Sequence, residues 1–402
     1  MAGKHSFAFY TDTYLPAVDG VVTSIINSAR ELRRRGHRVY IFTSGNQKHS
    51  VPEELRQDVF FMRGMRFRKY PQYSLALFPF ASALRIRDLD IELIHSHTPF
   101  MMGISGLTIA KVNRIPLVGS FHTLFTDKRV IDEYTTMNPM LRKLAYDKAW
   151  SYVRFFYNKC GRTIAPSEAI KEVLMSNAIE NVDVVPNGVD LSKFNRKADG
   201  SAIREKYAPN GEKLVLYLGR LSSEKGVEVM IKAAKRLSKK KIKFLIAGTG
   251  PAHERYRDMV ARNSLSNVVS FAGFVNDAEL PKYYAASDLF CMPSTFETQG
   301  IVSLEAMASG KPVVGADYLA LKDIIVDSKN GEKFKPGSSV DCARKIEKVI
   351  NHLDAYRGMR RTAEEYSDTL STEKLLNVYK SIQNSTSSNH NSDHKRYNNL
   401  YL

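Results

Sequence analysis

The chain has 402 residues, of which 43% are apolar and 25% are charged, and its formal net charge at pH 7 is +17. This length is too great for one ordinary core and favours two α/β domains in a soluble globular protein. The positive charge is compatible with nucleic acid, an anionic membrane surface or anionic substrates, and charge alone does not choose among these partners.

Three cysteines, Cys160, Cys291 and Cys342, lie far apart without paired spacing, which indicates a reducing, cytoplasmic compartment. We expect no signal peptide at the short, polar start Met1–His5. We also expect no membrane-spanning helix, because no apolar run reaches about 18 residues. Any membrane contact is therefore expected to be peripheral.

Residues 1–190 are expected to form a first domain in which strands and helices alternate. A strand at Phe7–Asp12, a loop, a helix at Val21–Arg35 and a strand at Arg38–Thr43 form the repeating unit of a parallel sheet. Further strands are expected at Val59–Met62, Leu93–His97, Pro116–His122, Arg162–Ala165 and Val182–Pro186.

The α/β pattern restarts after a polar stretch at 191–211, which is expected to be an interdomain linker. The second domain, at 212–383, is expected to contain strands at Leu214–Gly219, Lys243–Ala247, Val268–Ala272, Asp288–Met292 and Pro312–Gly315, followed by helices. Residues 384–402, rich in Asn, Ser and His, are expected to be disordered. The predicted fold class is α/β, with two Rossmann-like, doubly wound parallel-sheet domains that face each other across a ligand-binding cleft.

Two acids flank the start of a predicted helix in the second domain. Glu297 lies in the loop before the helix, and Glu305 lies about a turn and a half inside it, leaning back toward the N-terminus. The backbone amides near Gly300, Ile301 and Val302 open an anion-binding helix end. Such a site suits phosphates at the amides and hydroxyls at the carboxylates, which is the shape of a nucleotide sugar.

Two cations five residues apart, Arg220 and Lys225, follow the first strand of the second domain on a glycine-flanked loop. In this position they can clamp a diphosphate and neutralise the charge on a leaving nucleoside diphosphate without a metal. The alternative is that both are solvated surface cations.

Four weaker signals also lie at strand ends or helix starts. Gly248 belongs to a Gly-x-Gly that either meets a ligand or forms a simple tight turn, and Phe274 and Val275 stand where main-chain groups can read a nucleobase. Gly20 allows a phosphate to approach a helix start, or it serves only the turn. His122 can hydrogen-bond a sugar hydroxyl, or it is a satisfied interior histidine.

Two basic, aromatic stretches of the first domain are candidate acceptor or membrane contacts. An amphipathic basic helix that bears aromatic residues suits a membrane interface. The alternative is a helix whose apolar face is simply core. The candidate residues are Arg66, Arg68, Lys69, Arg142, Lys143 and Trp150.

Taken in order, the motifs resemble those of retaining glycosyltransferases of family 4, which have the GT-B fold, over about residues 5–383. The strongest motif is Glu297 and Glu305 with seven residues between them. The supporting segments are Asp19-Gly20, Phe121–Thr123, Pro186–Asp190, Gly219-Arg220 with Lys225, and Ala247–Gly250.

The resemblance implies roles for the candidate residues that meet the donor nucleotide. Arg220 and Lys225 would hold the donor diphosphate, helped by Gly20. Glu305 would bind the ribose hydroxyls. The family needs no divalent metal, so the resemblance implies no metal and no other cofactor.

The resemblance also implies contacts with the donor sugar. Glu297, with the amides around Gly300–Val302, would hold sugar hydroxyls, and His122 would contact the sugar near the reacting centre. No residue stands out as a covalent nucleophile. Front-face attack, in which the donor phosphate takes the acceptor proton, is therefore the mechanism that we expect.

Within the family, the segments Thr11–Pro16, His95–Phe100 and Glu297–Gly300 look most like diacylglycerol glucosyltransferases. Those enzymes glycosylate a lipid at the membrane surface. The resemblance implies transfer of a hexose, with UDP-glucose favoured, to a hydroxyl of diacylglycerol or an ether lipid at the inner face of the cell membrane. The loop Thr126–Arg129 departs from the acidic, aromatic stretch that is usual there, which leaves the acceptor open.

Other functions are compatible with the same motifs. GDP-mannose is an alternative donor, and a soluble or lipid-linked glycan is an alternative acceptor. A non-catalytic sugar-nucleotide-binding protein would carry the same donor site. Nucleic acid is not expected as a partner, because no nucleic-acid-binding module is recognisable and paired acids would repel phosphates.

Overall fold

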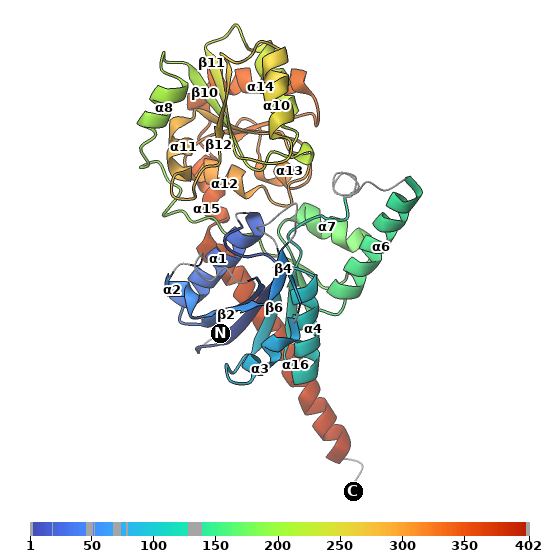
Figure 1. Ribbon diagram of the computed structural model, residues 1–402. Helices are drawn as coiled ribbons and strands as arrows, with labels where there is room; N and C mark the ends of the chain where they lie inside the picture. Colours follow the sequence, from blue (N-terminus) through green and yellow to red (C-terminus); the bar gives the residue numbers. More distant parts are fainter. Residues whose placement is uncertain are drawn as a thin grey trace. The chain divides into compact units, whose positions relative to one another are not determined.

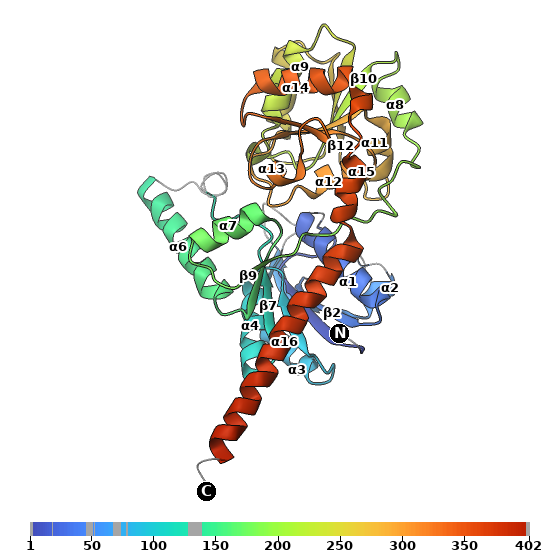
Figure 2. The same ribbon diagram turned by 180° about the vertical axis from the view of Figure 1, so that it is seen from behind.

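The computed structural model describes residues 3–17, 19–45, 51, 53–66, 74–77, 79–127 and 139–398 (Figures 1 and 2). The chain divides into two compact units, each with its own parallel sheet. The first unit comprises Met1–Thr126, Asn138–Gly188 and Asp368–Leu402, and the second comprises Asp127–Met137 and Val189–Ser367.

A seven-stranded parallel sheet forms the first unit, in the order β3-β2-β1-β6-β7-β8-β9. Its strands are β1 (Ser6–Thr11), β2 (Arg38–Ser44), β3 (Val59–Met62), β6 (Leu93–Ser96), β7 (Leu117–Ser120), β8 (Arg162–Ala165) and β9 (Val182–Val184). Its helices include α1 (Gly20–Arg34), α2 (Glu53–Arg56), α3 (Ala83–Ile86), α4 (Met101–Asn113), α6 (Pro139–Tyr157), α7 (Glu168–Ser176) and α16 (Asp368–Asn398). A small antiparallel pair, β4 (Gly64–Arg66) and β5 (Ser74–Ala76), stands apart from this sheet. β1 is buried along its whole length, as expected for a central parallel strand.

A six-stranded parallel sheet forms the second unit, in the order β12-β11-β10-β13-β14-β15. Its strands are β10 (Lys213–Leu218), β11 (Ile242–Ala247), β12 (Val269–Gly273), β13 (Leu289–Met292), β14 (Val313–Ala316) and β15 (Gly331–Phe334). Its α-helices are α8 (Ser201–Tyr207), α9 (Val227–Arg236), α10 (His253–Arg262), α11 (Leu280–Ala286), α12 (Ile301–Ala308), α13 (Ala320–Ile324), α14 (Ser339–Asn351) and α15 (Met359–Glu365).

Each sheet has one point where the order of strands reverses. β1 pairs with β2 on one side and with β6 on the other, and β10 pairs in the same way with β11 and β13. Loops leave the carboxyl ends of such neighbouring strands in opposite directions, which opens a ligand-binding crevice at that edge. The predicted fold class, two Rossmann-like doubly wound sheets, is confirmed.

Helix α16 is placed differently from the predicted boundaries, which assigned residues 368–383 to the second domain and 384–402 to a disordered tail. It groups with the first unit, where it packs beside α1 (Figure 2). An apolar stripe explains this placement, because such a stripe must be buried against a core. The stripe consists of Leu375, Leu376, Val378, Tyr379 and Ile382, and the helix continues to Asn398.

The stretch at 191–211, predicted as a linker, is part of the second unit and contains α8. Phe194 and Ala208 are buried in the core of that unit. Arg204 forms an ion pair with Asp288 at 2.6 Å and donates to the carbonyl of Ala286 at 2.9 Å. The polar composition of this stretch therefore reflects surface-facing positions on a segment that is anchored at both ends.

Strand β15 was not predicted, because its sequence carries two charged residues within four positions. One of these, Glu332, points inward and its side chain is fully buried. A buried carboxylate is tolerated in a strand only when donors surround it. The sequence of the strand alone does not contain those donors.

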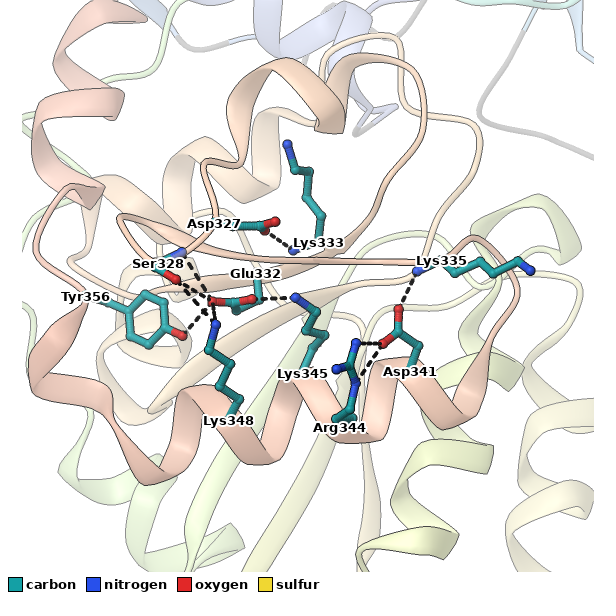
Figure 3. Close-up of polar contacts among 10 residues, drawn as sticks. All are labelled: Asp327, Ser328, Glu332, Lys333, Lys335, Asp341, Arg344, Lys345, Lys348 and Tyr356. Carbon is teal, nitrogen blue, oxygen red and sulfur yellow. Dashed lines mark hydrogen bonds and ion pairs between the residues drawn. The ribbon is translucent and has the colours of Figure 1, made fainter.

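The donors that surround Glu332 come from elements outside the strand (Figure 3). Lys345 Nζ and Lys348 Nζ, on α14, each lie 2.6 Å from a carboxylate oxygen. The Tyr356 hydroxyl donates at 3.0 Å, and both the amide and the hydroxyl of Ser328 donate at 3.2 Å. Burial pulls the pKa of Glu332 upward, but the hydrogen bonds from Lys345, Lys348 and Tyr356 outweigh it and lower the pKa to about 2. The cluster joins β15 to α14.

We expect Glu332→Gln to destabilise the second unit by about 3 kcal/mol, because Lys345 and Lys348 would lose their buried counter-charge. The low pKa also makes this stabilisation depend on pH. It is fully present above the ordinary carboxyl pKa of 4.5 and is lost as the pH falls from there through about 2. Calorimetric unfolding of the full chain across this pH range measures both effects.

The exposed pair Arg344–Asp341 on the same helix is the matched control. Figure 3 draws this pair beside the Glu332 cluster. The atoms of the pair are as close, at 2.6 Å, but the Arg344 side chain is 73% exposed. Arg344→Gln should therefore change the stability by less than about 1 kcal/mol. Equal losses from Arg344→Gln and Glu332→Gln would contradict a special role for the buried cluster.

Candidate functional site

The loops at the switch point of the second sheet carry most of the predicted donor-binding residues. Arg220 follows β10, and Lys225 ends the short helix η3 (Ser223–Lys225) on the same loop. Glu297 lies on the loop after β13, and its Oε1 is 2.7 Å from Lys225 Nζ. Both side chains are mostly buried, with exposed fractions of 22% for Lys225 and 11% for Glu297. The structure therefore brings a predicted cation and a predicted acid together as an ion pair.

Backbone contacts hold the two loops in these positions. Gly226, next to Lys225, has a φ of +63°, and a Cβ at Gly226 would lie 2.8 Å from the carbonyl oxygen of Pro293, at the end of β13. Only glycine allows this close approach. The Tyr217 hydroxyl donates to the carbonyl of Arg220 at 2.9 Å and so fixes the start of the loop. The cation positions thus follow from backbone packing.

A second backbone contact explains Gly248. The amide of Gly219 donates to Ala247 at 3.0 Å, and the amide of Leu221 donates to Thr249 at 2.9 Å. A Cβ at Gly248 would lie 1.9 Å from the carbonyl oxygen of Gly219. The packing of the two loops therefore requires the glycine, in line with the turn interpretation. Contact between Gly248 and a ligand stays a prediction.

Helix α12 begins beside Glu297 as the sequence predicted. Gly300 precedes it with a φ of +79°, and a Cβ there would lie 2.9 Å from Leu321 Cδ2. The amides of Ile301 and Val302 are in the first turn, where a helix contains no acceptor for them. This helix end therefore offers backbone donors next to the Lys225–Glu297 pair.

Glu305 is buried inside α12 and is held by a tyrosine from α11. Its Oε2 accepts a hydrogen bond from the Tyr284 hydroxyl at 2.8 Å. Burial raises the pKa of Glu305 to about 7, although Tyr284 and Lys193 lower it. The Lys193 charge is partly offset by Asp277, its ion-pair partner at 2.5 Å. The carboxyl group therefore titrates near neutral pH.

Phe274 and Val275 follow β12 at the same edge of the second sheet. Phe274 is 59% exposed, whereas Val275 packs against the core of the unit. The carbonyl of Gly273, just before them, accepts a hydrogen bond from the amide of Gly248 at 2.7 Å. This bond joins the loop after β12 to the loop after β11. The candidate residues on these two loops are therefore held next to each other.

In the first unit, Gly20 is the first residue of α1, and Asp19 caps this helix. Asp19 Oδ1 accepts from the amides of Val21 and Val22 at 3.0 and 2.9 Å. A Cβ built at Gly20 would meet nothing within 4 Å, and its φ is outside the left-handed region. Neither the turn nor the packing requires glycine here, so the turn interpretation loses its support.

His122 follows β7 in the first unit. Its Nε2 lies 3.1 Å from Nδ1 of His97, and the two rings are nearly parallel, 9° apart. Burial lowers the pKa of His122 to about 4, so the ring is neutral at physiological pH. Sequence reasoning placed His97 within the segment His95–Phe100 and assigned it no role of its own. Its contact with His122 spans 25 residues and has no local sequence signal.

Asp12, directly after β1, is a further, partly buried acid that sequence reasoning did not assign. Its Oδ2 accepts from Thr98 Oγ1 at 2.6 Å, and its Oδ1 accepts from the amide of Met102 at 3.0 Å. Burial raises the pKa of Asp12 to about 6 despite these bonds. The side chain therefore caps α4 and fixes the loop between β6 and α4. Its position directly after a buried strand was the available signal.

Comparison with known proteins agrees with this geometry. Residues 18–193 match the family model "Glycosyltransferase Family 4", and residues 200–366 match "Glycosyl transferases group 1". The alpha-monoglucosyldiacylglycerol synthase of Streptococcus pneumoniae is 31% identical over 335 residues, which are 81% of this chain and 74% of that protein. The chain belongs to glycosyltransferase family 4. Its relatives place it in the diacylglycerol glucosyltransferase-like branch of the family.

A further relative and a solved structure are also similar to this glycosyltransferase. A GDP-mannose-dependent alpha-mannosyltransferase of Mycolicibacterium smegmatis is 28% identical over 361 residues, which are 87% of this chain and 89% of that protein. The crystal structure of Anabaena HepE with UDP and glucose superposes with a TM-score of 0.75 at 21% identity, covering 94% of this chain and 100% of that chain. The structural match supports the GT-B fold.

The candidate membrane residues of the glycosyltransferase differ in solvent exposure, and some of them lie outside the described part of the chain. Trp150 is only 6% exposed and packs inside the first unit, so its assignment as a membrane contact is wrong. The apolar face of α6 that carries Trp150 is core, whereas Lys143 is exposed. Arg68 and Lys69 lie outside the described residues. The side chains of Arg66 and Arg142 also lie outside the described part.

Within the described part of the chain, no helix combines the length and the apolar character needed to cross a membrane. In the same residues, no three His, Cys, Asp or Glu side chains are grouped so that they could hold a metal ion. Independence from a metal stays a prediction of the family resemblance.

We expect Lys225→Ala to lower kcat by about 10²–10³-fold, which corresponds to about 2–4 kcal/mol of lost transition-state stabilisation. The reason is that Lys225 would stabilise the charge that develops on the leaving diphosphate. Initial rates of sugar transfer at saturating donor measure the effect. Lys235→Ala is the control, because Lys235 is an exposed lysine at the far end of α9 that contacts Asn263. Full turnover by Lys225→Ala would refute the assignment.

We expect Gly20→Ala to raise KM for the donor while leaving the first unit as stable as before or stabilising it by about 0.5–1 kcal/mol. Alanine fits the helix start sterically, but its methyl group would occupy the space that a phosphate needs. Steady-state kinetics and thermal unfolding separate the two effects. Gly103→Ala is the contrasting variant, since its Cβ would lie 2.1 Å from the Thr98 oxygen and should destabilise the unit. An unchanged KM in Gly20→Ala would contradict phosphate contact at this residue.

Proposed function

We propose that this glycosyltransferase is a retaining, metal-independent hexosyltransferase. It moves glucose from UDP-glucose to a hydroxyl of a membrane lipid, such as diacylglycerol or an ether lipid. The observation that carries the donor half of the proposal is the Lys225–Glu297 pair, which sits beside the first turn of α12 at the switch point of the second sheet. The activity for which the Streptococcus pneumoniae relative is named supports the acceptor half.

The Lys225–Glu297 pair gives each residue a role in donor binding. When a diphosphate arrives, it competes with Glu297 for the Lys225 ammonium group, because a diphosphate carries more charge than one carboxylate. Glu297 is then available to accept hydrogen bonds from the hydroxyls of the donor sugar. Binding of phosphate and binding of sugar are thereby coupled through one lysine.

The proposed reaction breaks the bond between the anomeric carbon and the phosphate oxygen and forms a bond from the acceptor oxygen to the same face of that carbon. The proton of the acceptor hydroxyl passes to an oxygen of the departing phosphate. Lys225 and Arg220 stabilise the negative charge on the leaving nucleoside diphosphate. No covalent intermediate with the protein is needed.

The surface of α6 supports a peripheral position at the inner face of the cell membrane. Leu144 and Phe155 are 53% and 52% exposed, which is unusual for large apolar side chains. Lys143 and Lys148 are exposed on the same helix, and Lys159 Nζ lies 5.1 Å from the centre of the Phe155 ring. Apolar groups flanked by lysines match the chemistry of an anionic lipid surface.

GDP-mannose is the second candidate donor, because several relatives are named GDP-mannose-dependent alpha-mannosyltransferases. The match to the one from Mycolicibacterium smegmatis covers 87% of this chain. The two donors differ in base and in one hydroxyl configuration of the sugar. A mannosyl donor would use the same ion pair and the same helix end. GDP-mannose can therefore be distinguished from UDP-glucose only by a direct comparison of transfer from the two donors.

The deciding experiment supplies radiolabelled UDP-glucose, UDP-galactose and GDP-mannose to the purified full chain with phosphatidylcholine–phosphatidylglycerol vesicles that contain diacylglycerol. We expect label from UDP-glucose in the organic phase, unchanged by EDTA, with the α configuration of the donor retained in the product by NMR. Label that stays in the aqueous phase would overturn the lipid acceptor. Transfer from GDP-mannose alone would overturn the donor, and a β product would overturn retention.

The raised pKa of Glu305 predicts that donor affinity depends on pH. Above a pH of about 7 the carboxylate is ionised and accepts strong hydrogen bonds from the ribose hydroxyls, and below it the group is protonated. We therefore expect the Kd of UDP-glucose, which has no group of its own that titrates near neutrality, to rise by about fivefold to tenfold on acidification through this range. Calorimetric titration measures the change.

Glu305→Gln is the matched control for this pH dependence, because glutamine keeps the shape of the side chain without its ionisation. The variant should bind UDP-glucose more weakly at high pH and show a flat profile. A profile of unchanged slope in Glu305→Gln would mean that another group causes the dependence.

A further inference from the structure

The first unit contains two buried histidines and a partly buried third that sequence reasoning could not connect. His95 and His97 lie on and directly after β6, and His122 follows the neighbouring strand β7. The rings of His95 and His97 are 4.0 Å apart at their centres, and those of His97 and His122 are 5.4 Å apart. The ring of Phe9, on β1, contacts the rings of both His95 and His97. The three imidazoles therefore form one layer at the carboxyl edge of the sheet.

Hydrogen bonds divide this layer into two parts. Both nitrogens of His95 are occupied by hydroxyl groups, with Tyr379 at 2.7 Å from Nδ1 and Ser120 at 2.8 Å from Nε2. His97 bonds instead to His122, through Nδ1 of His97 and Nε2 of His122 at 3.1 Å. His97 Nε2 is buried and has no hydrogen-bond partner. His95 and His97 therefore touch through their ring faces and do not share a proton.

The bond between His97 and His122 carries a single proton. Burial lowers the pKa of His97 well below its ordinary value and that of His122 to about 4, so both rings are neutral near pH 7. A neutral imidazole has one N–H and one lone pair. Either His97 Nδ1 donates to His122 Nε2, or His122 Nε2 donates to His97 Nδ1.

The unpartnered nitrogen of His97 decides between these arrangements. If His97 accepted at Nδ1, its own proton would be on Nε2, which would leave a buried N–H without an acceptor. Orphaned buried N–H groups are rare and costly in proteins. If His97 donates from Nδ1, its Nε2 carries only a lone pair. The second arrangement leaves no N–H unpaired on His97 and is the stable one.

We infer that His97 is a positioning residue that fixes His122 in the tautomer with its proton on Nδ1. His122 Nε2 then accepts from His97, and Nδ1 is a hydrogen-bond donor. Any oxygen that meets Nδ1 receives a hydrogen bond and keeps its own proton. His122 is thus assigned as a neutral donor and is excluded as the general base that deprotonates the acceptor hydroxyl.

This inference deepens the proposed function, on which it rests for the identity of the oxygen that His122 meets. In the proposed reaction a donor at this position would bind a hydroxyl or the ring oxygen of the transferred sugar. A histidine with the opposite tautomer would present a lone pair and could not make this bond. The tautomer therefore decides whether His122 donates to the sugar or accepts from it, and His97 sets it from the neighbouring strand end.

The test measures the tautomer directly in the full chain labelled with ¹⁵N-histidine. Long-range ¹H–¹⁵N correlation spectra near neutral pH distinguish a proton-bearing nitrogen from one that carries a lone pair, and His122→Gln identifies the His122 signals. We expect His122 Nδ1 to bear the proton and Nε2 to be the acceptor. A proton on His122 Nε2, or an imidazolium at neutral pH, would overturn the inference.

Substitutions at His97 test whether it imposes the tautomer. Asparagine places its amide nitrogen near the position of Nδ1 and can still donate, whereas phenylalanine keeps the ring shape and donates nothing. We expect His97→Phe to lose the single Nδ1–H tautomer of His122 and to reduce kcat/KM by about tenfold to a hundredfold. His97→Asn should keep the tautomer and most of the activity. His122 signals unchanged in His97→Phe would overturn the positioning role.

His95→Asn is the matched control, because His95 is equally buried and touches His97 but makes its hydrogen bonds to Tyr379 and Ser120. We expect this variant to leave the His122 tautomer unchanged, even if it lowers stability. A changed tautomer in His95→Asn would mean that packing, rather than the His97 bond, sets the proton. The spectra need no turnover, so an absence of sugar transfer with the expected tautomer would refute the proposed function and leave the assignment of His97 intact.

Discussion

Direct contact between backbones is the constraint on which the donor site of the second unit depends. The loop after β10 touches the loop after β11 at Gly219 and Gly248, and it touches the end of β13 at Gly226 and Pro293. Each contact is too close for a Cβ. A side chain at either Gly226 or Gly248 would push the loops apart and would separate Lys225 from the segment that carries its partner acid. The glycines of this edge therefore act on the ligand site indirectly, through the position of the cations.

The Lys225–Glu297 ion pair is well suited to a site that binds and releases a charged ligand. Lys225 and Glu297 are mostly but not fully buried, so their attraction exceeds that of a surface pair without the full desolvation cost of a deeply buried one. Within the pair, each charge is compensated by the other. In the proposed donor complex, a diphosphate would replace Glu297 as the partner of the lysine, and hydroxyl groups of the sugar would hydrogen-bond the carboxylate.

The sequence predicted those parts of the fold and site that are encoded within one segment. The spacing of Glu297 and Glu305, with Gly300 between them, correctly indicated a helix that begins beside an acid. The contact between Lys225 and Glu297 spans 72 residues and depends on the backbone contact at Gly226, so no local pattern contained it. Strand β15 was missed because the lysines that compensate Glu332 lie on another element.

The remaining differences between the predicted and the observed structure also arise from long-range packing. The apolar stripe of α16 was visible in the sequence, but its destination in the first unit depends on the core that it covers. Trp150 was read as a membrane contact because an amphipathic helix looks the same whether its apolar face meets lipid or core. The burial of Trp150 and the exposure of Phe155 show that α6 buries one face and presents another. Helical periodicity alone did not indicate which of the two faces packs against the core.

The two units differ in how they make polar groups available at their strand ends. At the carboxyl edge of the second sheet, Lys225 and Glu297 are charged and satisfy each other. At the corresponding edge of the first sheet, burial keeps His97 and His122 neutral, and Asp12 is occupied by the helix that it caps. Within the proposed reaction a neutral donor at His122 does not compete for the proton of the acceptor hydroxyl. The departing phosphate is then the natural acceptor of that proton, and its rising negative charge makes it a stronger base as the bond to the sugar breaks.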